Sequence, residues 1–179
     1  AEAGGSRRTI YELFGNKDGV FEAVIRNCTG RVVAVMADLE LSQMPLRAAL
    51  IHFGETLMTL LTTPETIRYM RLFLSEVPRF PHLGKVFYES GLMSGRRIIT
   101  SYFERQMEEG NFPKSDPKQA AVFFTSLLKA DYDFRQMTYV GWEPHAKDLH
   151  AHVIAAVDMF LRGYGIDPAK VDQKTPAQA

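Results

Sequence analysis

Apolar residues recur at steps of three and four along nearly the whole chain, which is the spacing of one face of an α-helix. The first long stripe consists of Phe21, Val24, Ile25, Cys28, Val32, Val35, Met36 and Leu39. No comparable apolar-polar alternation of period two is present, and this alternation is what a half-buried strand would show. The pattern therefore predicts an all-α fold.

Proline marks the expected starts of the next two helices. Pro45 begins a second helix, because proline is tolerated in a first turn, where its missing N–H costs nothing. Thr63-Pro64-Glu65 repeats this start signal for a third helix, which should stop before Pro78. The short segment Pro78-Arg79-Phe80-Pro81 is expected to form a corner.

Glycines and one aspartate divide the second half of the chain. A short helix through Val86 and Phe87 is expected to end at Gly91, and a longer one should follow until Gly110 caps it. Asp116-Pro117 combines an N-cap side chain with proline at the first helical position, so a helix is predicted from there through Phe134.

The last predicted helix begins at Pro144 and runs to about Gly163. Its apolar residues cover more than one stripe, which is too wide for a helix with a single buried side. A second partner surface is implied. Residues 165–179 are rich in Pro, Lys, Gln and Ala and are expected to form a disordered tail.

Composition indicates a soluble globular protein. The chain has 179 residues, of which 46% are hydrophobic and 23% charged, enough to bury a full core. A single cysteine, Cys28, excludes an internal disulfide and fits a reducing cytoplasm. Polar residues interrupt every apolar run before the roughly 20 residues that a bilayer requires, so no membrane association is expected. Lys+Arg and Asp+Glu both count 21, so the overall charge does not indicate a polyanionic partner.

Local chemistry near the start of the chain is more specific. In "SRRTIYELFGNKDGVF", residues 6–21, Ser6 is a good N-cap for a short helix that Gly15 would end. Asn16 is a second N-cap, with Lys17 just inside the next helix. Two helix N-termini that carry cationic side chains offer the donors that phosphate oxygens accept from. The alternative is a solvated helix-turn-helix corner, because nearby carboxylates balance the local charge.

The residues "AGGSRRTIYELFGNKDGVF", 3–21, resemble the end of a TetR-type DNA-binding domain, whose pattern runs roughly A-G-V-S-x-x-T-[IL]-Y-x-[HY]-F-x-[SN]-K-[ED]-x-L-F. The resemblance implies that Ser6 to Phe14 is the recognition helix, which enters the major groove. It implies phosphate contacts for Thr9, Tyr11 and Lys17, and positions near base edges for Arg7 and Arg8. The implied DNA-binding residues are therefore Ser6, Arg7, Arg8, Thr9, Tyr11 and Lys17.

The chain departs from the family pattern in three places. Gly5 stands where valine is usual, Leu13 where His or Tyr is usual, and Gly19-Val20 where a larger residue and Leu are common. Because glycine is conformationally flexible, Gly5 and Gly19 would make the turn less rigid than the family pattern does. In the family, two further helices precede this motif. Only five residues precede it in this sequence, so we expect that these two helices are missing from it.

The rest of the sequence also resembles TetR-type regulators, but less specifically. "RLFLSEVPRFPHLGKVFYESG", residues 71–91, is similar to a subgroup with an AefR-like C-terminal domain. The resemblance implies a partial helix-turn-helix DNA-binding domain at 1–28 and a helical-bundle domain for ligand binding and dimerisation at 29–164. The last two helices would pair with those of a second subunit, placing two recognition helices about 34 to 36 Å apart on a palindromic double-stranded operator. The expected interface residues are Phe124, Leu128, Val153, Val157 and Phe160.

Methionine and aromatic side chains of the middle helices are candidates for a ligand site. Met and Phe form adaptable walls for apolar ligands, although most such residues simply form core. We expect a small apolar or aromatic effector, with one polar contact from Asp131, Tyr102 or Arg96. For Asp131 the alternative is an ion pair with Arg135 within one helix. The predicted ligand-binding residues are Phe53, Met70, Phe73, Arg96, Tyr102, Phe103, Phe123, Leu127 and Asp131.

Other chemistry is weakly indicated. His145, Asp148 and His152 share a helix face, but three such residues from one helix rarely enclose a metal, and a polar rim of the dimer interface is the preferred interpretation. Phosphate loops, G-x-S-x-G and H-E-x-x-H are missing from the sequence, so neither an enzyme nor a cofactor is expected. The sequence thus predicts a ligand-responsive regulator, most simply a repressor. The rival hypothesis is a helical ligand-binding or protein-interaction module without DNA binding.

Overall fold

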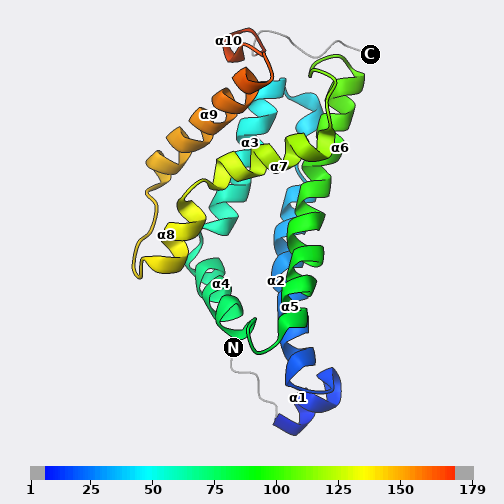
Figure 1. The fold of residues 1–179 in the computed structure, drawn as a ribbon, viewed down its shortest axis with the longest axis vertical. Coiled ribbons are helices and arrows are strands. Elements are labelled where there is room, and N and C mark those ends of the chain that lie inside the picture. Colours follow the sequence, from blue (N-terminus) through cyan, green and yellow to red (C-terminus); the bar gives the residue numbers. More distant parts are fainter. Residues whose placement is uncertain (1–6, 172–179) are drawn as a thin grey trace.

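The structure is a computed structural model, and it describes residues 7–171. Every regular element in this range is helical, which confirms the predicted all-α class (Figure 1). Ten are α-helices: α1 (Arg7–Phe14), α2 (Lys17–Ala37), α3 (Leu46–Leu61), α4 (Pro64–Glu76), α5 (Pro81–Phe87), α6 (Ser94–Glu108), α7 (Pro117–Lys129), α8 (Tyr132–Thr138), α9 (Ala146–Gly163) and α10 (Pro168–Val171). A 3₁₀ turn lies at Leu41–Gln43, and a π-helical segment lies at Tyr88–Met93 between α5 and α6.

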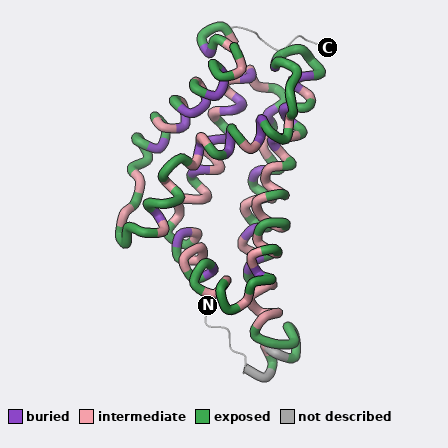
Figure 2. Tube along the Cα trace, viewed as in Figure 1, coloured by how far each residue is buried: buried purple, intermediate pink, exposed green. Residues whose placement is uncertain are grey.

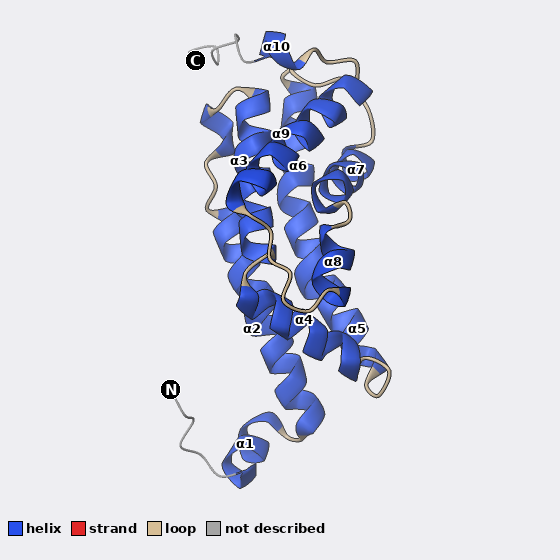
Figure 3. Cartoon of the chain, turned by 90° about the vertical axis from the view of Figure 1, so that its left-hand side faces the viewer, coloured by secondary structure: helices blue, strands red, loops and turns tan. Residues whose placement is uncertain are grey.

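The molecule is elongated, and α2 and α6 run beside each other along its length (Figure 1). At the end opposite α10, α1 projects away from the rest at the start of α2 (Figure 3). At the other end α3, α6, α7 and α9 pack together. Helix α2, which follows the candidate DNA-contacting motif, therefore extends from this projecting corner into the body of the protein.

Buried side chains form two clusters of unequal size. The larger one joins α3, α6, α7 and α9, and its centre is Phe103, whose ring lies 6.0 Å from that of Phe124 and 5.4 Å from that of Phe160. The smaller one joins α2, α4 and α5 through Ile25, Phe73 and Leu83. Purple, buried positions in Figure 2 concentrate toward the end with α10, whereas none of the α1 residues whose burial is described is buried.

The helix starts predicted from local capping signals are confirmed. The Thr63 side chain caps α4 by accepting from the N–H of Thr66, and proline follows it. Oδ1 of Asp116 accepts from the N–H groups of Lys118 at 2.9 Å and Gln119 at 3.3 Å, and Pro117 is the first helical residue of α7. These signals could be predicted because a cap and the helix that it starts are only a few residues apart.

The predicted helix end at Gly91 is wrong. From Pro81 to Glu108 the chain stays helical, passing through the π-helical segment, and Gly91 lies inside it. Glycine at this position is explained by packing, because a Cβ at position 91 would lie 2.8 Å from Cγ2 of Thr29. Gly91 therefore permits the close approach of α2 and does not end a helix.

The predicted single helix from Asp116 through Phe134 is also wrong. It breaks after Lys129 at Ala130, whose φ of 40° and ψ of −126° are incompatible with an α-helix, and α8 starts at Tyr132. A non-glycine residue with positive φ is uncommon, and no glycine or proline at this point of the sequence indicates the break.

Two boundaries of predicted segments in the last part of the chain also differ from the prediction. His145 is the N-cap of α9, so this helix begins at Ala146, two residues after the predicted start at Pro144. Part of the expected disordered tail is helical, because Pro168–Val171 form α10 and Pro168 is buried.

Candidate ligand cavity and DNA-contacting corner

The candidate DNA-contacting motif forms a tight corner between α1 and α2. The Oδ1 atom of Asn16 accepts from the N–H of Gly19 at 2.9 Å, which confirms Asn16 as the predicted N-cap of α2. Gly15 has a φ of 79°, a conformation that glycine adopts without steric cost. A Cβ on Gly19 would lie 1.9 Å from the carbonyl oxygen of Phe14, so glycine at this departure from the family pattern lets α1 fold back closely against α2.

The candidate DNA-binding residues lie on or beside this corner. Arg7, Arg8, Thr9 and Tyr11 are on α1, and Thr9 is exposed. Ser6 lies outside the described residues. These positions agree with the predicted placement of the recognition helix, and their contacts with DNA stay a prediction.

Lys17, the predicted phosphate contact at the start of α2, also has partners within the protein. Its Nζ lies 4.0 Å from Oε2 of Glu76, at the end of α4. The same atom lies 5.3 Å from the ring centroid of Phe21 and 5.6 Å from that of Phe80. Lys17 therefore helps to hold α2 against the turn between α4 and α5, whatever it does toward DNA.

A cavity of about 640 Å³, hereafter the main cavity, lies among the helices and is lined by residues between Cys28 and Met137. Its walls come from α2 to α8 and from the π-helical segment. Most of its lining is aliphatic or aromatic, which suits a drug-sized apolar ligand. The cavity has walls in both clusters, since Met36 and Phe53 belong to the larger one and Tyr69 and Phe87 pack against the smaller one.

Three of the nine predicted ligand-binding residues line the main cavity, namely Phe53 of α3, Met70 of α4 and Arg96 of α6. Phe73 instead lines a smaller cavity of about 320 Å³ between α1, α2 and α4, hereafter the junction groove. Its ring packs 4.6 Å from that of Phe87.

The other five predicted ligand-binding residues are elsewhere, and their assignment is corrected. Phe103 is fully buried in the larger cluster, and Tyr102 is buried beside it. Phe123 is 52% exposed on the outside of α7, and Leu127 packs against the larger cluster. Asp131 is exposed and pairs with Arg135 over 2.7 Å, which is the alternative that the sequence left open.

Sequence reasoning missed several polar residues that line the main cavity, above all Tyr69 of α4. Thr29 and Thr125 also line it, but each hydroxyl donates to a carbonyl of its own helix, Ile25 at 2.8 Å and Ala121 at 2.8 Å. A threonine within an apolar stripe was the only available signal, and it is weak because such self-satisfied hydroxyls are ordinary in helices.

The acidic groups of the main cavity have cationic partners. Glu65 of α4 accepts from Nη2 of Arg31 over 2.7 Å, and this bond and the charge of Arg31 lower the pKa of Glu65. Asp133 of α8 lies 3.1 Å from Nζ of Lys129. The cavity therefore presents no unpaired carboxylate among the described residues.

Helix α8 covers part of the main cavity with Gln136 and Met137. Arg71 of α4 holds this helix at its C-terminal end, because its Nη2 and Nε donate to the carbonyl oxygen of Gln136 at 2.6 and 3.0 Å. The same Nη2 also donates to the carbonyl oxygen of Tyr139 at 3.2 Å. A guanidinium group at the C-terminus of a helix is stabilised by the helix dipole as well as by these bonds.

The five residues assigned to the dimer interface belong to the interior of a single chain. The exposed fraction is 0% for Phe124, Leu128, Val153 and Val157 and 3% for Phe160. Their side chains are enclosed by the larger cluster, so this choice of residues is wrong. The same two helices expose other apolar side chains, Phe123 of α7 and Met159 of α9.

The histidine pattern of α9 does not gather into a metal site. Among residues 7–171, no group of three or more His, Cys, Asp or Glu side chains is placed to hold a metal ion. Nε2 of His152 lies 2.8 Å from the carbonyl oxygen of Leu128, and its ring packs 4.8 Å from that of Tyr132.

Within the described part of the chain, no helix has the length and apolar character needed to cross a membrane.

Comparison with known proteins identifies the class to which this fold belongs. Residues 48–166 match the family model of the AefR-like transcriptional repressor C-terminal domain. No curated protein matches the chain.

Solved structures of three proteins share the fold. A protein described as a TetR-family transcriptional regulator from Mesorhizobium loti is 25% identical, with a TM-score of 0.86 over 92% of this chain and 83% of that one. The flavonoid-responsive regulator FrrA is 22% identical, with a TM-score of 0.71 over 90% and 81% of the two chains. A TetR transcriptional regulator from Agrobacterium tumefaciens is 24% identical, with a TM-score of 0.69 over 89% and 78%.

The fold and the projecting two-helix corner define a TetR-type transcriptional regulator. Since the matched segment covers more than half of the sequence, the chain belongs to the AefR-like transcriptional repressors of this type. Regulators of the TetR type bind DNA and dimerise.

Proposed function

We propose that the protein is a ligand-responsive repressor, which binds a palindromic operator as a homodimer and leaves it when a small apolar or aromatic effector enters the main cavity. One observation carries this proposal: α2 is continuous from Lys17 to Ala37. Its first residues follow the DNA-contacting corner, and residues from Cys28 to Met36 line the main cavity. The predicted domain boundary at residues 28 and 29 falls within this one helix.

The response follows from the position of α2. An effector that occupies the main cavity pushes against α2 from the side of α3 and α4 and tilts it. Because α1 projects from the far end of α2, a small tilt moves the recognition helix by several times the displacement at the cavity (Figure 1). In a dimer this changes the distance between two recognition helices, which must stay about 34 to 36 Å apart to read two half-sites.

The effector must bind the DNA-free conformation more tightly than the DNA-bound one. A coupling free energy of about 1 to 3 kcal/mol corresponds to a change in operator affinity of roughly 5- to 150-fold. An effector with equal affinity for both conformations would not release DNA, however tightly it bound.

The lining of the main cavity supports an apolar or aromatic effector. Phe53, Leu57, Leu60 and Met70 offer surfaces that adapt to a flat or irregular apolar body. One protein of the same fold is described as responsive to flavonoids, which are aromatic molecules of drug-like size. We propose that this protein acts in the cytoplasm, on DNA present there.

The dimer interface is proposed on the exposed faces of α7 and α9. Phe123 and Met159 expose 52% and 62% of their surfaces on helices whose opposite faces are fully packed. Large exposed apolar side chains on adjacent helices are typical of a surface that a second subunit covers.

A cavity-filling variant tests the proposal. Leu57→Trp adds bulk at the α3 wall of the main cavity, without touching the corner that contacts DNA. An aromatic effector is first found by thermal-shift screening of the complete protein, and an operator by selection from random duplexes. We expect the variant to respond to this effector at least about 10-fold less, with operator affinity changed by less than about threefold.

Val140→Trp is the matched control, because Val140 is exposed and lies outside the main cavity. It should respond as the wild type does. An unchanged response of Leu57→Trp, or a screen that yields only strongly polar effectors, would contradict the assignment of the cavity. Failure of the complete protein to select any duplex would favour the rival module without DNA binding.

A further inference from the structure

Two residues that line the main cavity each carry a buried hydrogen-bond donor that the protein itself leaves unused. The hydroxyl oxygen of Tyr69 and the Nε atom of Arg96 are buried, and neither has a hydrogen-bond partner among residues 7–171. Both residues line the main cavity, Tyr69 from α4 and Arg96 from α6. Buried polar groups are nearly always paired in folded proteins, and among the unpaired ones in the described residues only these two belong to the wall of the main cavity.

The threonine hydroxyls and the other charged groups of the main cavity are already engaged. Hydroxyl groups of Thr29 and Thr125 donate to carbonyls of their own helices, and that of Thr66 donates to the carbonyl oxygen of Leu60 at 2.9 Å. The cationic groups of Arg31 and Lys129 face Glu65 and Asp133, as described above.

Arg96 differs from the other cations of the cavity, because no carboxylate within the described residues pairs with it. A guanidinium group has N–H donors and no acceptor. Burial raises the pKa of Tyr69, so its hydroxyl keeps its proton and can donate at neutral pH. Arg96 is thus the one cation of the cavity lining that no carboxylate of the described residues pairs with, and the side-chain amide of Gln136 adds one neutral donor and one acceptor.

We propose that the effector is an apolar acid, with a carboxylate or phenolate oxygen that Arg96 binds and a second acceptor that Tyr69 binds. This inference rests on the function proposed above and names the chemical class of its effector. Arginine binds carboxylates through parallel N–H donors, and such charge-assisted bonds are about twice as strong as neutral ones. The apolar body fills the rest of the cavity against α2 and α3.

The first experiment measures binding by titration calorimetry with two probes of nearly equal shape, biphenyl-4-carboxylate and biphenyl-4-carboxamide. The wild type should bind the carboxylate about 10-fold more tightly or better, because the anion meets Arg96. In Arg96→Met, which keeps an apolar stem but removes the charge, the preference should fall below about threefold.

Arg97→Met is the matched control, since Arg97 is exposed on the same helix and donates to Ser94 at 2.8 Å. It should keep the wild-type preference. Equal binding of both probes by the wild type, an unchanged preference in Arg96→Met, or no binding of either probe up to about 1 mM would each overturn the inference.

The second experiment tests Tyr69 with 4′-acetyl- and 4′-ethylbiphenyl-4-carboxylate, of which only the first carries a second acceptor. Tyr69→Phe should weaken the acetyl compound by roughly 3- to 10-fold and leave the ethyl compound within about twofold. An equal loss for both compounds would mean that Tyr69 only supports the wall.

The Leu57→Trp variant separates this inference from the proposed function. If it abolishes binding of both biphenyl carboxylates while Arg96→Met changes nothing, the cavity is the ligand site but the acid-binding role of Arg96 is wrong. If Leu57→Trp leaves both affinities unchanged, the probes bind elsewhere, and the ligand site itself is misplaced.

Discussion

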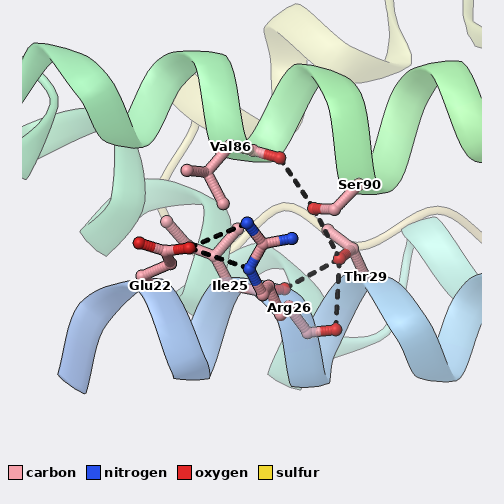
Figure 4. A network of polar contacts seen from close by, with 6 residues as sticks. All are labelled: Glu22, Ile25, Arg26, Thr29, Val86 and Ser90. Atoms are coloured by element: carbon pink, nitrogen blue, oxygen red, sulfur yellow. Dashed lines mark hydrogen bonds and ion pairs between the residues drawn. The ribbon is translucent and has the colours of Figure 1, made fainter. Parts of the chain in front are cut away.

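Thr29 of α2 and Ser90 of the π-helical segment join their two helices by a hydrogen bond of 3.2 Å between their hydroxyl oxygens (Figure 4). Each hydroxyl also lies within bonding distance of a carbonyl oxygen of its own helix, Thr29 of Ile25 at 2.8 Å and Ser90 of Val86 at 2.7 Å. Since each hydroxyl has one hydrogen, the hydroxyl that donates to its partner across the contact gives up the bond to its own helix. Gly91, next to Ser90, makes this approach possible, because it has no Cβ to collide with the Thr29 methyl group. The contact lies beside the main cavity, on the helix that leads to the DNA-contacting corner.

Substituting Gly91 tests this contact. Gly91→Ala places a Cβ 2.8 Å from Cγ2 of Thr29, and such overpacking costs about 1 to 3 kcal/mol. The gain in helix propensity is only about 1 kcal/mol, so we expect a net decrease in the free energy of unfolding of up to about 2 kcal/mol. Thr29→Ser removes the methyl group and keeps the hydroxyl. The double variant should therefore be more stable than the sum of the two single effects, as measured by urea unfolding.

Gly30→Ala is the control for helix propensity. Gly30 also lies inside a helix, α2, but nothing lies within 4 Å of a Cβ built there. This substitution should raise the free energy of unfolding by about 0.5 to 1 kcal/mol. If both alanines stabilise the protein equally, Gly91 has no special role in the helix contact.

Arg71→Met should loosen α8 over the main cavity. It removes the bonds from the guanidinium to the carbonyl oxygens of Gln136 and Tyr139, and hydrogen bonds to charged groups contribute about 1.5 to 3 kcal/mol. We expect amide hydrogen exchange in residues 132–138 to accelerate by at least about 10-fold, while exchange in α9 stays unchanged. Arg68→Met, an exposed position on the preceding turn of α4, should leave the exchange of α8 as it is.

Lys17→Ala should weaken operator binding and reduce its salt dependence. If Lys17 binds a phosphate, the slope of log K against log of salt concentration decreases by about 1, because one counterion fewer is released. If Lys17 only holds α2 against Glu76 and Phe80, affinity falls but the slope stays the same. Lys85→Ala serves as control, since Lys85 is exposed on α5 and pairs with Glu89.

Charges on the two sides of α7 and α9 should have opposite consequences. Phe123→Asp and Met159→Asp introduce a charge at exposed positions, so we expect folded monomers by sedimentation. Val157→Asp places an unpaired charge in the core, where Val157 is fully buried, so it should lose helicity by circular dichroism. A dimer that survives both exposed charges would exclude this interface.

The correctly predicted features depend on neighbours in the sequence. The caps at Asn16, Thr63 and Asp116 are local, because the side chain and the N–H that it binds are two or three residues apart. The role of Gly91 and the helix break at Ala130 could not be predicted from neighbouring residues. Gly91 is explained by a methyl group 62 positions earlier, and the break at Ala130 has no proline or glycine to mark it.

The candidate site was harder to predict, because an apolar side chain is equally at home in a core and in a cavity wall. Phe53 and Phe103 both fit a helical apolar stripe, yet only Phe53 lines the main cavity. On α9 the stripe is so wide that the sequence could not distinguish the inner face with Val157 from the outer one with Met159. No sequence pattern marks Tyr69 as a site residue, because its hydroxyl is seen to be buried and unpaired only once the surrounding helices are in place.

The double position of α2 has a practical consequence for anyone who would redesign this protein as a biosensor. Residues such as Val32 and Met36 belong to the helix that carries the DNA-contacting corner, so changing them alters the range of compounds detected together with the switching threshold. Wall residues on α3, such as Leu57 and Leu60, can be varied without altering that helix. A library meant to retune detection should therefore be built on α3 first, with α2 kept constant.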